Sequence, residues 1–312
     1  SRAGIHAGDI IIKIGTQSVQ GMSMNDAVNL MRGDVGTAIT LTVMRNNQEQ
    51  PLEFNLVRET IKTHSVKEKM LESGYAYIRI AQFQASTTEE LNKALVALQK
   101  QGKIRGLILD LRNNPGGLLD EAVGVSDVFL NKGLIVYTKG RISSSNMRYS
   151  ATVGEMLPGV PMIVLVNQGT ASAAEIVAGA LQDNHRARIL GANTFGKGTV
   201  QTVIPINEKK AIKLTTALYY TPSGRSIQAE GIKPDIVDSD NSISVAQSSA
   251  LTSEASLEKH IINSNTPKKK ATAPNNGDKN KEDIAPAVKA PTKYADAPAD
   301  NQLQDALQLL KK

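Results

Sequence analysis

The apolar positions follow one pattern before about residue 59 and another after it. In the first part, short runs alternate apolar with polar residues around one helical segment, which predicts a small β-rich module. The later part alternates strand-like runs with helical spacing, which predicts an α/β core. The predicted strands are 9–14, 38–44, 51–57, 75–80, 104–111, 202–206 and 211–220, and the predicted helices are 25–32, 87–99 and 118–130.

The stretch 161–201 contains the candidate chemistry. It opens with six apolar residues typical of a strand covered on both faces, and helical spacing begins near Ser172. Ser172 is therefore predicted to lie where a strand turns into a helix. The unpaired N–H groups and partial positive charge of a helix start would stabilise an oxyanion there, notably through the N–H of Ala173. Ser172 is thus a candidate nucleophile.

A serine nucleophile needs a base, and Lys197 is the candidate. Gly196 and Gly198 on either side allow the backbone to turn tightly, so that the lysine can reach inward. The amine can take a proton near neutral pH only if burial lowers its pKa from the usual ~10.4. Gln201 follows in a strand-like run and is a candidate for holding this amine by a hydrogen bond.

Each of these residues also has a structural interpretation. Ser172 and Glu175 have the spacing of a capping box, in which the two side chains satisfy each other's backbone N–H groups at a helix start. Lys197 alone is typical of a solvated turn, and Gln201 alone indicates little. Only the combination favours catalysis.

Several blocks of sequence resemble the signature of the carboxy-terminal processing proteases, also called tail-specific proteases. The resemblance implies a serine endopeptidase with a Ser/Lys dyad, in which Ser172 is the nucleophile, Lys197 the general base and Gln201 its orienting partner. It runs from the first residues to about residue 237. The blocks are 110–117, 170–176, 195–201, 219–227 and 231–236.

The segment 113–117, Asn-Asn-Pro-Gly-Gly, is predicted to form another part of the site, opposite the turn of Ser172. On its own it is an ordinary tight turn between a strand and a helix. The resemblance implies that the backbone N–H of Gly116 or Gly117 joins that of Ala173 around the oxyanion. It also implies a fold for residues 59–237: an α/β core of the ClpP and crotonase type with additional β segments.

Residues 1–58 resemble a PDZ domain that lacks its beginning. Domains of that type bind the C-terminus of a peptide as an added strand beside a helix. Val28 and Met31 would line this groove, or would equally pack into the core of the module itself. The chain opens in mid-motif at Ser1, so we expect a fragment without its leader and without the loop that would hold a peptide carboxylate.

The last part of the chain divides into a linker and a helix. Residues 238–299 are rich in Pro, Lys and Ala, a composition typical of a flexible linker. Residues 300–312 resume a helical pattern, with an apolar face formed by Leu303, Ala306, Leu307 and Leu310. A short apolar helix needs a partner, so we predict a contact between subunits of a homo-oligomer; the alternative is a frayed chain end.

Composition excludes some classes of protein. With 0 cysteines there is no disulfide, thiol nucleophile or Cys-ligated zinc, and no apolar run approaches the ~18 residues of a membrane span. The net charge of +6 comes from 36 basic and 30 acidic residues with interspersed signs, so a nucleic-acid partner is not expected. No metal-binding motif is present, and neither a metal nor a cofactor is expected.

The histidines fit a Ser/His/Asp triad poorly. His185 falls at the end of the helix that Ser172 begins, roughly 20 Å away at ~1.5 Å per residue, and is better explained as a partner of the helix dipole. Glu175 and Asp183 on the same helix are interpreted as a cap and a solvated carboxylate. The other histidines lie in or just after the PDZ-like part or in the tail: His6, His64 and His260.

The leading hypothesis is an endopeptidase that recognises exposed C-terminal or unstructured segments of proteins and cleaves them through an acyl-enzyme. The resemblance further implies a periplasmic location and control by an activating adaptor protein. Two alternatives remain. One is a non-catalytic scaffold that binds protein C-termini, and the other is a crotonase-like acyl-thioester enzyme, which the Ser/Lys pairing disfavours.

Overall fold

The computed structural model of this 312-residue protein describes residues 3–6, 8–45, 48, 50–60, 64–72, 74–207, 210–237, 253–257, 260–261 and 300–312. The chain forms two compact units, Ser1–Thr63 and His64–Lys312. The predicted helices and strands are all present; 38–44 and 75–80 match at both ends, and the others differ by at most three residues at either end. The predicted linker 238–299 lies almost entirely outside the described residues.

The first unit is a four-stranded antiparallel sheet with one helix. The strand order is β2-β1-β3-β4. The helix begins at Ser23, whose side chain accepts a hydrogen bond from the N–H of Asp26 at 3.2 Å. The elements are β1 (Ile10–Ile14), β2 (Gln17–Ser18), α1 (Met24–Met31), β3 (Ala38–Met44) and β4 (Leu52–Val57).

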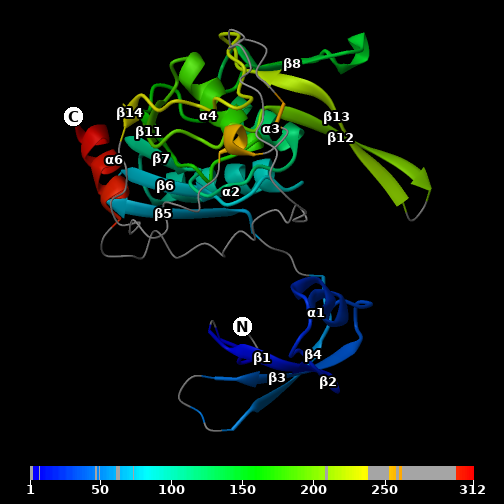
Figure 1. Cartoon of the computed structure of the whole chain (residues 1–312). Coiled ribbons are helices and arrows are strands. Elements are labelled where there is room, and N and C mark those ends of the chain that lie inside the picture. Colours follow the sequence, from blue (N-terminus) through cyan, green and yellow to red (C-terminus); the bar gives the residue numbers. More distant parts are fainter. Residues whose placement is uncertain are drawn as a thin grey trace. The chain divides into compact units, whose positions relative to one another are not determined.

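The second unit is built on a six-stranded sheet with the strand order β14-β11-β10-β7-β6-β5 (Figure 1). All neighbours are parallel except β5, which pairs antiparallel with β6 at one edge. The sheet consists of β5 (Val66–Glu72), β6 (Tyr75–Ile80), β7 (Gly106–Asp110), β10 (Met162–Val166), β11 (Arg188–Gly191) and β14 (Ile236–Val237), and the helices are α2 (Thr87–Gln101), α3 (Leu119–Phe129), α4 (Ala173–Asp183) and α6 (Asn301–Lys311).

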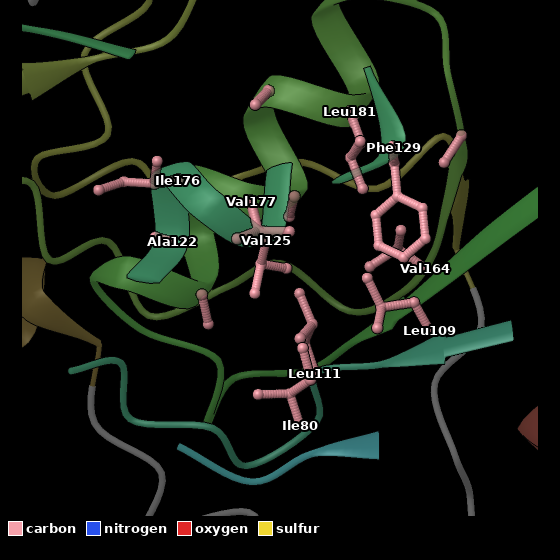
Figure 2. Packing of buried hydrophobic residues seen from close by; sticks show 14 of the residues in the cluster. Ile80, Leu109, Leu111, Ala122, Val125, Phe129, Val164, Ile176, Val177 and Leu181 are labelled. Carbon is pink, nitrogen blue, oxygen red and sulfur yellow. The ribbon is translucent and has the colours of Figure 1, made fainter. Parts of the chain in front are cut away.

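Alternate residues of the central strands face two separate cores. On one face, side chains of β6, β7 and β10 pack against α2, α3 and α4, and Figure 2 shows Leu109 and Val164 of the sheet near Phe129 of α3 and Leu181 of α4. On the other face, Tyr77 and its neighbours pack against α6. The central strands are therefore buried on both sides, as the apolar run 161–166 predicts for β10.

The C-terminal helix α6 packs within the chain. Leu303, Ala306 and Leu307 are buried in the second core, together with Tyr77 and Ile108 of the sheet. The predicted contact between subunits through this apolar face is therefore wrong for this structure, because the chain's own sheet covers the face. The alternative of a frayed end is also wrong, since residues 301–311 form a docked helix.

A second sheet of this unit has the order β12-β13-β8-β9. Its strands are β8 (Leu134–Gly140), β9 (Arg148–Ser150), β12 (Thr199–Asn207) and β13 (Lys210–Tyr220). The hairpin β12–β13 extends beyond the other elements of the unit (Figure 1). Among the described helices, none has the length and apolar character needed to cross a membrane.

Candidate active site

Ser172 lies at the turn between β10 and α4. The turn is anchored by Thr170, whose hydroxyl donates to the backbone oxygen of Leu111 at 2.8 Å. Ser172 is partly buried and has a φ of +54° and a ψ of −117°, a strained conformation for a residue with a side chain. It directly precedes Ala173, the first residue of α4, as predicted, so it lies at the start of a helix.

The segment 113–117 contacts this turn directly. The backbone oxygen of Asn114 accepts from the N–H of Ala171 at 2.9 Å, and its side-chain amide donates to the backbone oxygen of Ile80 at 2.8 Å. A Cβ atom on Gly116 would lie 2.8 Å from Cβ of Ser172. Only glycine allows the loop to approach the serine so closely, and its φ of +98° is also a conformation that favours glycine.

The three predicted oxyanion donors differ in the structure. The N–H of Gly116 donates to Oδ1 of Asn114 at 2.9 Å, so it is already occupied. The N–H groups of Gly117 and Ala173 have no acceptor among the residues that the structure describes. Of the three predicted donors, these two are therefore the ones whose N–H groups are not already bonded within the described residues.

The third segment of the site is the loop 194–197, which meets the serine turn through shared hydrogen bonds. The N–H of Phe195 donates to the backbone oxygen of Thr170 at 3.0 Å. The N–H of Lys197 donates to Oε2 of Glu175 at 2.9 Å, and the N–H of Ser172 donates to the same oxygen at 2.8 Å. The backbone nitrogens of Ser172 and Lys197 therefore bind the same oxygen atom, so these two residues are close neighbours in the site.

Glu175 is the residue that joins these loops. Besides the two bonds to Oε2, its Oε1 accepts from the hydroxyl of Thr194 at 2.5 Å and from the N–H of Gly196 at 2.8 Å. The side chain is fully buried, and burial raises its pKa from 4.5 to about 7, although the hydrogen bonds from these donors oppose the rise.

The sequence predicted that Glu175 caps the helix, and this prediction accounts only for its hydrogen bond from the N–H of Ser172. Its contacts with the lysine loop were missed, and only the sequence of the loop, with Thr194 and Gly196 ahead of Lys197, carried a signal for them.

The side chains of Lys197 and Gln201 are less constrained than their backbones. Lys197 is partly buried, and Gln201 is exposed near the start of β12. Neither side chain makes a hydrogen bond within the part of the chain that the structure describes. The structure therefore brings the backbone of Lys197 to Ser172, whereas the predicted bond between Lys197 and Gln201 is not formed in it.

The remaining polar residues of α4 have structural roles. Asp183 is not a solvated carboxylate, which corrects the expectation from the sequence: it pairs with Arg225 and accepts from the N–H of Ser223 at 2.9 Å. Burial opposes its ionisation, but hydrogen bonds from Thr221 and Ser223 and the charge of Arg225 lower its pKa overall. His185 is exposed just beyond the end of α4.

Val28 and Met31 lie on α1 of the first unit. Both are partly buried, and no residue of this helix is fully buried. Neither is therefore a fully buried core residue, and a role in binding a peptide stays a prediction.

Comparison with known proteins groups the chain with proteases. A model of peptidase family S41 matches residues 74–238, and a PDZ domain model matches residues 1–45. A carboxy-terminal-processing protease of Bartonella bacilliformis is 51% identical over 240 residues, which are 76% of this chain and 55% of that protein. The carboxy-terminal processing protease CtpA of Bacillus subtilis is 38% identical over 235 residues, 75% of this chain and 50% of that protein.

A solved structure supports the same grouping. The photosystem II D1 C-terminal processing protease is 30% identical, with a TM-score of 0.52 over 83% of this chain and 70% of that one. This chain spans about half the length of the curated relatives that it matches.

Proposed function

This chain belongs to peptidase family S41, and on that premise we propose that it is a serine endopeptidase acting through Ser172 and Lys197. The observation that carries the proposal is the shared carboxylate oxygen of Glu175. It holds the backbones of the proposed nucleophile and the proposed base side by side. Such a fixed arrangement is what a nucleophile and its activating base require.

The proposed reaction begins with proton transfer from the Ser172 hydroxyl to the neutral amine of Lys197. The Ser172 oxygen then attacks the carbonyl carbon of the scissile peptide bond, and the resulting oxyanion accepts from the N–H groups of Ala173 and Gly117. As the C–N bond breaks, the Lys197 ammonium returns its proton to the leaving amine. An acyl-enzyme remains, and water attacks it with Lys197 again taking the proton.

Gln201 has the smaller part in this proposal. Its exposed side chain lies four residues beyond Lys197, on the first strand of the hairpin. We assign it the role of holding the amine once a substrate lies in the site and excludes water. The bond would then form only in the complex.

The substrate class follows from family membership. We propose that the protein cleaves exposed C-terminal or unstructured segments of proteins, and that the PDZ-type first unit selects them through a groove beside Val28 and Met31. We further propose a ClpP and crotonase type of core, a periplasmic location and an activating adaptor. The six-stranded sheet with α2, α3 and α4 on one face supports the proposed type of core.

Replacing Ser172 with alanine tests the proposal. We expect Ser172→Ala to lower the cleavage of fluorescein-labelled casein by at least ~10³-fold, because the covalent route is lost. The control is Ser143→Ala, which changes an exposed serine of the 3₁₀ turn Ser143–Ser145 and should leave the rate unchanged. Equal cleavage by wild type and Ser172→Ala would disprove the assignment of Ser172.

The same pair of proteins separates the scaffold alternative. A fluorophosphonate reagent should modify wild type on Ser172, as located by mass spectrometry of peptides, and should not modify Ser172→Ala. A wild-type protein that binds casein, cleaves none of it and resists the reagent would support the non-catalytic scaffold instead.

A further inference from the structure

Four charged side chains are buried together at the end of β7, next to α6. Asp110 is 0% exposed, Arg112 2%, and Arg79 and Asp300 are 7% exposed each. Two positive and two negative charges therefore balance inside the second unit. One of the two carboxylates, Asp300, comes from the C-terminal segment and is the residue that precedes α6.

Arg112 is the centre of this cluster. Its guanidinium donates twice to Asp110, at 3.0 and 2.8 Å, and twice to Asp300, at 2.9 and 2.7 Å. A fifth bond reaches Oε1 of Gln302 at 3.1 Å. Two of these partners lie 188 and 190 residues away along the chain. Bidentate pairs of this kind fix the geometry of both partners.

The same arginine lies at the start of the loop that forms one wall of the proposed active site. Its backbone oxygen accepts from Arg79 at 3.1 Å, and its N–H donates to Asp110 at 2.9 Å. Two residues further on, Asn114 binds Ala171 in the nucleophile turn and holds Gly116 against Ser172. We call the loop 111–118 the oxyanion loop. Because its backbone is tightly hydrogen-bonded, a displacement of Arg112 would be transmitted along it to Gly116, which lies against Ser172.

From this connection we propose that Asp300 is a positioning residue for the oxyanion loop, acting through Arg112, and that docking of α6 regulates the proposed protease. The inference rests on the proposed function for its effect on catalysis. The coupling between α6 and the loop 111–118 can be tested without it.

The docked state of α6 depends on this cluster together with the apolar face that packs in the second core. An isolated helix of 11 residues is marginal in water, so α6 is expected to lose its structure when it leaves the sheet. Undocking would also leave Arg79 and Arg112 with Asp110 as the one remaining carboxylate of the described cluster. Because the paired bonds from Asp300 help to fix the guanidinium of Arg112, their loss would let this arginine and the loop that follows it shift.

The first test compares two aspartates of the C-terminal segment in the full chain. Asp300→Asn removes the buried charge, and Asp305→Asn makes the same chemical change at an exposed position of α6. We expect Asp300→Asn to lower kcat for labelled casein at least tenfold with KM changed by less than twofold, short of the ~10²–10³-fold cost of losing one oxyanion donor. Asp305→Asn should match wild type.

Hydrogen exchange measures the coupling itself. In Asp300→Asn, amides of both α6 and the loop 111–118 should exchange faster than in wild type and in Asp305→Asn. Faster exchange in α6 with an unchanged loop and an unchanged kcat would overturn the inference. If the loop responds but wild type cleaves nothing, the proposed function fails and the coupling stands.

A second arm covers the case in which Asp300→Asn does not fold. A protease cleavage site is placed in the segment between Ile261 and Asp300 of the otherwise wild-type chain and is cut after folding. Dilution should then reduce kcat and speed up exchange in the loop 111–118, and excess synthetic peptide 300–312 should restore both. The same peptide with Asp300→Asn should not. Full activity after the C-terminal fragment has been separated from the protein would contradict the proposal.

Discussion

The loop 194–197 and the hairpin β12–β13 are neighbours along the chain but differ sharply in what holds them. The loop is bound to the fully buried carboxylate of Glu175, deep in the second unit. From Gln201 to Asn207, every residue of β12 is exposed. This stretch pairs only with Lys210–Thr215 of its own hairpin, since β13 meets β8 from Ala217 onward.

The contrast indicates that the backbones of Ser172 and Lys197 are preorganised in the proposed site, whereas the side chain of Gln201 is not. The backbones of Ser172 and Lys197 are held by hydrogen bonds to the fully buried carboxylate of Glu175. The position of Gln201 depends on two-stranded pairing alone, which is marginally stable in water. We therefore expect substitutions around Glu175 to damage activity and stability together, and substitutions on the hairpin to have small effects.

Among the substitutions that test this contrast, Gly116→Ala should have the largest effect. The added methyl group would lie 2.8 Å from Ser172 Cβ and 2.8 Å from the backbone oxygen of Ala171, and neither neighbour is a flexible side-chain end. We expect a loss of unfolding free energy of about 2–4 kcal/mol by urea denaturation and a fall in kcat of roughly 10²-fold or more, because a misplaced oxyanion loop loses its donors.

Gly159→Ala is the matched control for Gly116→Ala. Gly159 also has a positive φ, +70°, but a methyl group there would meet nothing within 4 Å. It should show the backbone penalty of about 1 kcal/mol without a loss of kcat. A Gly116→Ala protein as active as Gly159→Ala would contradict the close approach of the loop to Ser172.

Glu175→Gln should have the next largest effect on activity. Both carboxylate oxygens accept from N–H donors, and an amide nitrogen at either position would face one of them with its own hydrogens. The loop of Lys197 would shift, and we expect kcat to fall roughly tenfold to a hundredfold. The exposed Glu89→Gln on α2 is the control. Normal activity in Glu175→Gln would show that this carboxylate does not position the dyad.

The same variant should change how stability depends on pH. The pKa of Glu175 is raised from 4.5 to about 7 in the folded protein, so the folded state binds more protons than the unfolded state between these values. Stability from this group is therefore present below pH 4.5 and is lost as the pH rises to about 7. Relative to Glu175→Gln, wild type should lose roughly 2.5 kcal/mol between pH 5 and pH 8 in urea denaturation. Parallel curves would contradict the raised pKa.

The local parts of the site could be predicted from the sequence, because they depend on residues close together in the chain. A β-branched run, a glycine turn and helical spacing placed Ser172 at the start of α4, where it lies. The partners of Glu175 could not be predicted in this way. Thr194 and Gly196 are 19 and 21 residues away, and they reach the carboxylate only when the sheet has formed.

The C-terminal helix shows the same limit in another form. Its amphipathic pattern correctly predicted a helix with one buried face, but periodicity does not say what covers that face. Of the strands that it covers, only the run 161–166 was predicted to be buried on both faces, and that prediction did not say which element covers the second face. The pairing of Asp300 with Arg112 depends on that docking and left no local signal.

Gln201→Ala should have the smallest effect, and it tests the hairpin side of the comparison. Because the side chain is exposed and has no hydrogen bond among the described residues, unfolding free energy should not change measurably. A hydrogen bond to Lys197 formed only with substrate bound contributes about 1 kcal/mol, so kcat should fall roughly fivefold. Gln99→Ala, at an exposed position near the end of α2, is the control. A loss above a hundredfold would mean that the hairpin holds the amine as firmly as Glu175 holds the loop, and the contrast between the two regions would then be wrong.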